Sequence, residues 1–172
     1  MQSRLKILGH APHPMLIVFP LGLLATAVAF DLINLFGGSD VWLEASYRMI
    51  AAGVITGLLA AAFGWIDWFA IPADTRAKAI GLTHGLGNVV VLILFAASWL
   101  IRRGEVTDPD TVAFVLSFAG AGLAVITGWL GGELVERLRV GIDDEAGLDA
   151  PSSLREGTAR VRGPVGGPPV TH

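Results

Sequence analysis

The hydrophobic pattern divides most of the chain into four long apolar segments separated by short polar breaks. The segments cover approximately residues 14–36, 48–71, 80–101 and 111–135. Each is long enough for a transmembrane helix, which needs about 20 apolar residues. Helices are expected because backbone polar groups in lipid must be hydrogen-bonded within the segment, and the short alternating segments of a barrel do not occur. The pattern therefore predicts an all-α integral membrane protein with four transmembrane helices.

The polar breaks predict how these helices are arranged. Residues 36–40 (FGGSD) and 102–110 (RRGEVTDPD) close one end of the bundle, and residues 71–78 (IPADTRAK) close the other. Short connections make successive helices antiparallel neighbours, so we expect an up-down bundle of two helical hairpins. The transmembrane domain is predicted over residues 1–138. Residues 139–172 are polar and rich in glycine and proline, which favours a disordered tail.

Composition agrees with a membrane protein and excludes several classes of site. Of the 172 residues, 53% are hydrophobic and 16% are charged, whereas soluble domains carry about 25% charged residues. The chain has no cysteine, which excludes disulfides, cysteine-ligated clusters and cysteine nucleophiles. The net charge of −3 gives no indication of a nucleic-acid partner.

Lysine and arginine near the helix ends predict the orientation in the membrane. The three loops and termini of one side carry Arg4, Lys6, Arg76, Lys78, Arg137 and Arg139, and the other side carries Arg48, Arg102 and Arg103. The excess of basic residues favours both termini in the cytoplasm.

The second half of the chain is similar to the first. GHAPHPMLIVFPLGLL opens the first helix and GLTHGLGNVVVLILFA opens the third, so His13 matches His84 at an offset of 71. The pair Gly64–Trp65 matches Gly128–Trp129 at an offset of 64. This register superposes small residues that permit close helix packing in lipid, namely Thr56, Ala60 and Gly64 over Gly120, Ala124 and Gly128. A duplication predicts a pseudo-two-fold axis along the membrane normal, although membrane helices also share composition without common descent.

Several polar side chains are predicted to gather at the end of the bundle that holds both termini. These candidates are His10, His13, Asp67, His84 and Glu133. Four of them also fit ordinary interfacial or helix-end positions. His84 lies inside the third apolar segment, where ionisable residues usually face the bundle interior and serve a function. Asp31 and Asn34, near the opposite end of the first helix, are interpreted as interfacial.

Two histidines on facing helices suggest a b-type haem. The first and third helices are diagonal in an up-down bundle, roughly 11–14 Å apart, and two imidazoles can ligate one iron axially. The residues predicted to make room for the ring or pack on it are Gly85, Gly131, Gly132, Trp65 and Trp129. Asp67 or Glu133 is expected to accept the second imidazole N–H, as carboxylates often do around ligating histidines.

A bare metal ion is the alternative ligand for the same end of the bundle. His10, His13, His84, Asp67 and Glu133 together form a donor set that suits zinc, iron, nickel or copper. No His-x-x-x-His spacing on one helix occurs, so the pattern does not favour any particular metal.

The motifs HPMLIVFPLGLL, THGLGN and GWLGGELVERLRVGI resemble a bacterial family of predicted four-helix membrane proteins of unknown function (DUF2231-like). The resemblance covers approximately residues 8–142, and its motif positions are His13, His84, Gly131, Gly132 and Glu133. It implies a bacterial inner-membrane protein. Some members are joined to Rieske-type iron–sulfur domains, which implies a redox setting but supplies no catalytic residue.

The sequence thus favours a small membrane redox component that binds haem b between His13 and His84 and passes electrons to a partner. The alternatives are a cofactor-free structural or assembly subunit, including a homo-oligomer, and a bare metal-binding protein. A transporter or channel fits less well, because polar residues do not line the full length of the helices. No catalytic constellation is recognisable, so an enzyme is not expected.

Overall fold

The computed structural model describes residues 3, 5–144 and 146–153. Its helices are α1 (Pro12–Leu16), α2 (Val18–Leu35), α3 (Val41–Ala70), α4 (Arg76–Arg102) and α5 (Thr111–Gly132), followed by the π-helical turn η1 (Glu133–Arg137). Four spans are long and apolar enough to cross a membrane: Pro12–Leu35, Val41–Ala70, Arg76–Arg102 and Thr111–Arg137. The predicted all-α class with four transmembrane helices is confirmed.

The first transmembrane span is divided into α1 and α2 near Ile17. Pro20 lies one turn further on and has no N–H to donate to the carbonyl of Leu16, so the helical ladder is interrupted there. Backbone hydrogen bonds from Ile17 to His13 and from Leu21 to Ile17 continue the chain direction across the break. The short α1 therefore carries His13 as the first turn of an otherwise continuous span.

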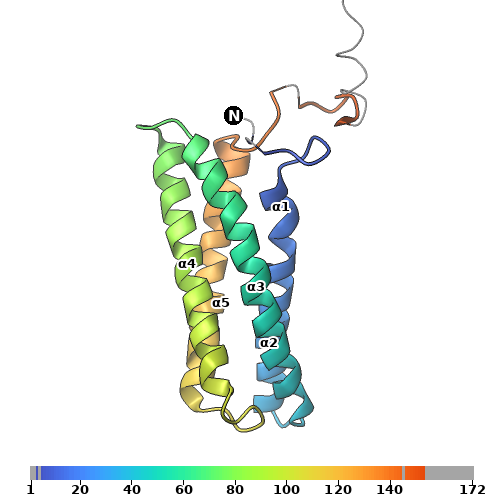
Figure 1. Ribbon diagram of the computed structural model, residues 1–172, viewed down its shortest axis with the longest axis vertical. Coiled ribbons are helices and arrows are strands. Elements are labelled where there is room, and N and C mark those ends of the chain that lie inside the picture. Colours follow the sequence, from blue (N-terminus) through green and yellow to red (C-terminus); the bar gives the residue numbers. More distant parts are fainter. Residues whose placement is uncertain (1–2, 4, 145, 154–172) are drawn as a thin grey trace, which may run out of the picture.

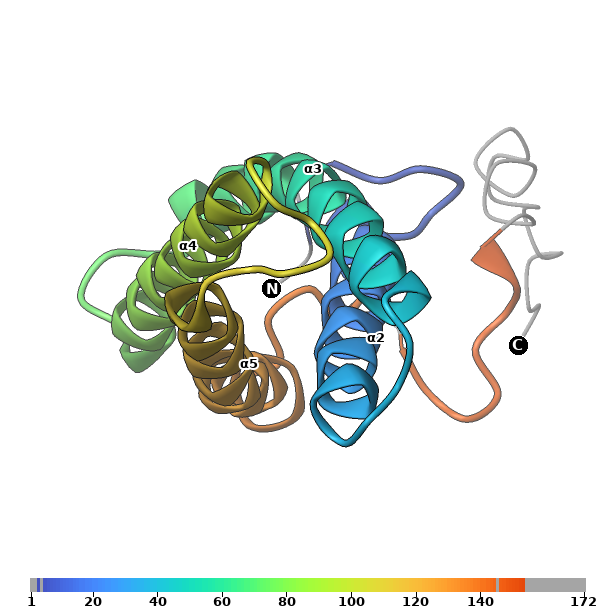
Figure 2. The ribbon, with the colours of Figure 1, turned by 90° about the horizontal axis from the view of Figure 1, so that it is seen from below.

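The four spans form an up-down bundle (Figure 1). Both described ends of the chain and the α3–α4 connection lie at one end, and the α2–α3 and α4–α5 connections lie at the other. Viewed along the bundle, α2 is diagonal to α4 and α3 is diagonal to α5 (Figure 2). We call α1–α3 the first hairpin and α4–α5 the second. The hairpins pack against each other mainly through α3 and α4, and contact between α2 and α5 is slighter.

Local signals in the sequence account for the helix boundaries. Thr75 caps α4 by accepting a hydrogen bond from the Lys78 N–H, and Asp110 caps α5 by accepting one from Val112 N–H. Such side-chain caps satisfy N–H groups that have no partner inside the helix. The α2 helix ends before Gly37, whose φ of +99° is a conformation that glycine adopts without strain.

Glycines allow close contact between neighbouring helices. A Cβ on Gly53 would lie 2.6 Å from the Leu24 side chain, and one on Gly57 would lie 2.5 Å from Leu92. In the second hairpin, a Cβ on Gly120 would lie 2.9 Å from Phe95. Small residues at helix contacts are the usual packing device in lipid, where apolar side chains gain little by leaving the solvent.

The first part of the predicted tail packs on the N-terminal segment. Lys6 Nζ donates to Asp143 Oδ2 at 2.7 Å, and Ser153 Oγ donates to the Leu8 carbonyl at 3.2 Å. The predicted disorder of the tail concerns mostly residues 154–172, which lie outside the described residues. That part of the domain assignment stays a prediction.

Candidate functional site

His13 and His84 come together inside the bundle, at the end that holds the chain's termini. Their ring centroids are 6.5 Å apart and the rings are perpendicular, with an interplanar angle of 89°. His13 lies on α1 in the first hairpin and His84 on α4 in the second. Both side chains are partly buried, so the site is formed only when the two hairpins dock.

Each of the two histidines is fixed by the neighbouring helix of its own hairpin. His13 Nδ1 is 2.8 Å from the Ala60 carbonyl oxygen, and His84 Nδ1 is 2.8 Å from the Thr127 carbonyl oxygen. Gly64 and Gly131 lie under the rings: an added Cβ would be 2.9 Å from His13 Cε1 and 3.1 Å from His84 Cε1, respectively. The two imidazoles therefore occupy equivalent settings in the two hairpins.

The carbonyl contacts determine which ring nitrogen carries hydrogen. A carbonyl oxygen can only accept a hydrogen bond, so Nδ1 of each histidine must be the donor. In a neutral imidazole this leaves Nε2 with a free lone pair, the state in which histidine ligates metals. The expected carboxylate partner is replaced at both rings by a backbone carbonyl, which orients a ligating imidazole equally well.

Asn88 adds a second polar contact at His84. Its amide nitrogen lies 3.5 Å from His84 Nδ1 and 3.3 Å from Nε2, and it donates to the His84 carbonyl oxygen at 2.9 Å. An in-plane approach equidistant from both nitrogens would collide with Cε1, so the amide lies over the face of the ring. Asn88 Oδ1 also accepts from Thr127 Oγ1 at 3.1 Å. Asn88 therefore links the two residues that position this imidazole.

The other predicted ligands do not join the histidine pair. His10 is exposed and bonds the Leu8 carbonyl through Nδ1 at 3.2 Å. Asp67 accepts a hydrogen bond from Ser3 Oγ at 2.6 Å, and Glu133 pairs with Arg76 at 2.6 Å. No group of three or more histidine, aspartate or glutamate side chains able to hold a metal ion occurs in the described part of the chain.

The predicted ring-packing residues are placed differently from the expectation. Gly85 does not leave an open space, because the Trp65 indole lies 3.4 Å from the position of an added Cβ. Trp129 is 67% exposed on the outer surface of α5, so it does not contact the pair. No atom lies within 4 Å of an added Cβ on Gly132.

The expected pairing of Gly64 with Gly128 is wrong in register. Gly64 packs on His13, but an added Cβ on Gly128 would meet nothing within 4 Å. Gly131, three residues further along α5, packs on His84 instead. A shift of three residues rotates the contact face by most of a turn of helix, which is why Trp129 points outward whereas Trp65 is half-buried.

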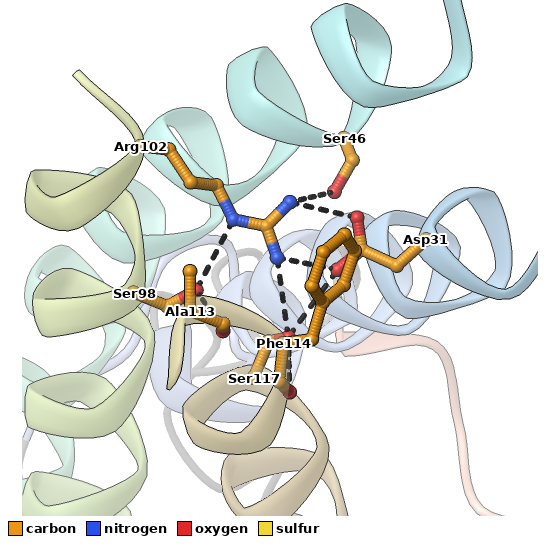
Figure 3. Close-up of polar contacts among 7 residues, drawn as sticks. All are labelled: Asp31, Ser46, Ser98, Arg102, Ala113, Phe114 and Ser117. Carbon is orange, nitrogen blue, oxygen red and sulfur yellow. Dashed lines mark hydrogen bonds and ion pairs between the residues drawn. The ribbon is translucent and has the colours of Figure 1, made fainter. Parts of the chain in front are cut away.

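A second polar cluster lies toward the opposite end of the bundle and was missed by the sequence interpretation. Arg102 and Asp31 are both 0% exposed and form an ion pair of 2.7 Å (Figure 3). The interpretation of Asp31 as interfacial is therefore wrong, because its carboxylate is enclosed by all four spans. The offset of 71 that matches His13 to His84 also matches Asp31 to Arg102, and this signal identifies the pair in the sequence.

The fold and its two buried polar sites define a four-helix integral membrane protein made of two docked hairpins. Residues 9–144 match the family described as predicted membrane protein (DUF2231), and the chain belongs to this family. No curated protein and no solved structure matches the chain.

Proposed function

We propose that the protein is a small membrane redox component in which His13 and His84 ligate one haem b, and that it exchanges electrons with a partner protein. The observation that carries this proposal is the convergence of two imidazoles from different hairpins, each with its Nδ1 engaged by a backbone carbonyl. When bound, the haem iron would supply the one-electron chemistry. The residues of the chain would bind and orient the group and exclude water from it.

The separation of the two rings supports ligation of one metal centre from opposite sides. Metal–imidazole nitrogen bonds are about 2.0–2.1 Å long. Adding the distance from each ligating nitrogen to its ring centre gives about 6 Å between the centroids of two opposed imidazoles. The observed 6.5 Å is close to this value, and perpendicular ring planes are compatible with axial ligation on one axis.

The number of donors favours haem over a bare ion. Zinc and similar ions in proteins usually take four ligands, but the pair supplies only two imidazoles, and no larger donor group occurs in the described residues. A haem brings four nitrogens of its own and needs only axial ligands from the protein. A bare metal-binding site remains the alternative, and the experiment below separates it from haem.

Matching contacts in the two hairpins support the proposal of an internal duplication. Along the first helix of each hairpin, the offset of 71 relates Leu24 to Phe95 as well as His13 to His84. Along the second helix, an offset of 67 relates Gly53 to Gly120, and these glycines pack on Leu24 and Phe95, respectively. A pseudo-two-fold axis between the hairpins would pass between the two histidines and give one shared site.

We propose that both termini, and therefore the histidine site, face the cytoplasm of a bacterial inner membrane. Arg102 is buried in an ion pair, so it does not act as a loop charge. Its removal from the count leaves Arg48 and Arg103 opposite the six basic residues of the terminal side. This increases the asymmetry that governs orientation.

The test is an oxidised and a dithionite-reduced absorption spectrum of the full chain, purified in detergent after expression with haem supply. We expect a Soret band in the parent, its loss in His13→Ala and His84→Ala, and its retention in His10→Ala, which alters an exposed histidine. Metal analysis by mass spectrometry accompanies the spectrum. A stoichiometric metal without a Soret band would identify the bare metal site. A parent with neither haem nor metal, and a double His→Ala variant of unchanged stability, would indicate the cofactor-free structural role.

A further inference from the structure

Arg102 lies at the centre of a closed polar cluster formed by all four membrane spans. Figure 3 shows its guanidinium directed between α2, α3 and α5. We call this set the Arg102 cluster, and its side chains are Asp31, Ser46, Ser98, Arg102 and Ser117, all 0% exposed.

Every N–H of the guanidinium has an acceptor within the cluster. Nη1 donates to Asp31 Oδ1 at 2.8 Å and to Ser46 Oγ at 3.5 Å. Nη2 donates to Asp31 Oδ2 at 2.7 Å and to Ser117 Oγ at 3.4 Å, and Nε donates to Ser98 Oγ at 3.3 Å. The Phe114 ring lies against the guanidinium, 4.9 Å from Cζ to the ring centroid. Because all five donors are used and one face is covered, no donor remains for a ligand or a permeating ion.

The cluster connects the two hairpins at a defined height along the bundle. Asp31 and Ser46 belong to the first hairpin, whereas Ser98, Arg102 and Ser117 belong to the second. A bidentate Arg–carboxylate pair tolerates little displacement because its two hydrogen bonds are parallel. The pair therefore fixes how far α2 and α4 are shifted along each other.

The spacing between the cluster and the histidines is the same on both helices. Asp31 follows His13 by 18 residues, and Arg102 follows His84 by 18 residues. Eighteen residues are five turns of α-helix, so on each span the charged residue and the histidine share one face, about 27 Å apart. The alignment of Asp31 with Arg102 therefore carries His13 to the height of His84.

From this geometry we infer that Asp31 and Arg102 are positioning residues, which set the register between the hairpins and hold His13 opposite His84. The role in placing cofactor ligands rests on the proposed function. The placement of the two histidines by the ion pair does not depend on any cofactor.

The test measures the distance between the hairpins beside the histidines in the full-length protein. Because the chain has no cysteine, Met15→Cys and Leu86→Cys introduce two unique spin-label sites, both at exposed positions, 51% for each side chain. Pulsed electron paramagnetic resonance then gives the distance distribution in Asp31→Asn and in Ser117→Ala, which keeps both charges and removes one hydroxyl. Asp40→Asn is the matched control, since it neutralises an exposed carboxylate near the same end.

We expect a narrow distribution in the parent and in Asp40→Asn, and a broadened or shifted one in Asp31→Asn, with a smaller change in Ser117→Ala. The exchanged pair Asp31→Arg with Arg102→Asp should restore part of the narrow distribution. If Asp31→Asn does not fold, Ser117→Ala and the exchanged pair decide the result. Parental distributions in all folded cluster variants would overturn the inference. A parent without a Soret band would instead refute the haem proposal and leave this distance test valid.

Discussion

His13 and His84 are 71 residues apart in the sequence, yet their ring centroids lie 6.5 Å from each other inside the bundle. Each ring is held by a carbonyl of the adjacent helix in its own hairpin. The distance between the rings therefore depends on how the two hairpins dock, and the following predictions test the parts of that arrangement.

Neutralising one member of the buried ion pair should strongly destabilise the protein. Asp31→Ala leaves the Arg102 guanidinium buried without its counter-charge, and breaking such a pair costs about 3–5 kcal/mol. Reversible unfolding in mixed micelles measures the change. Asp40→Ala, at an exposed position, should change the free energy of unfolding by no more than about 0.5 kcal/mol.

Replacing both charges should be less harmful than replacing one. The double variant Asp31→Leu with Arg102→Met removes both buried charges together and keeps similar volumes, and such replacements are often neutral. Its unfolding free energy should lie above that of either single variant, which a double-mutant cycle in the same micelles determines. Simple addition of the two single losses would show that the residues do not act as a pair.

A methyl group under either imidazole should displace it. Added Cβ atoms at Gly64 and Gly131 would lie 2.9 Å and 3.1 Å from ring carbons of His13 and His84. Overpacking of this kind costs about 1–3 kcal/mol, so Gly64→Ala and Gly131→Ala should be destabilised and should shift the imidazole NMR signals. Gly128→Ala is the control, because nothing lies within 4 Å of its added Cβ and alanine has the higher helix propensity. An equal loss in all three variants would exclude a specific effect on the rings.

The ion pair between Arg76 and Glu133 should contribute little, in contrast to Arg102. The Arg76 side chain is 60% exposed, and exposed ion pairs are usually worth less than about 1 kcal/mol. Arg76→Gln should therefore unfold close to the parent, with little dependence on salt concentration. A loss as large as that of Arg102→Gln would mean that the end of the bundle near Glu133 also fixes the docking of the hairpins.

The spans and the approach of the two histidines follow from the sequence because hydropathy fixes the helices and short loops fix their order. The hydrogen-bond partners of the imidazoles do not, because every residue offers a carbonyl and only the packed structure selects Ala60 and Thr127. Trp129 was misplaced because a three-residue error in register changes which face of α5 is inside. Asp31 was misjudged because its position near a helix end is compatible with both an interfacial and a buried carboxylate.

The most direct test of the central claim is the haem content of the purified full chain, measured by pyridine haemochrome and expressed per polypeptide. The account predicts about one haem b per chain in the parent and in His10→Ala, and close to none in His13→Ala or His84→Ala, since two imidazoles serve one iron. Absence of haem from the parent after expression with haem supply, or full retention in both His13→Ala and His84→Ala, would contradict it.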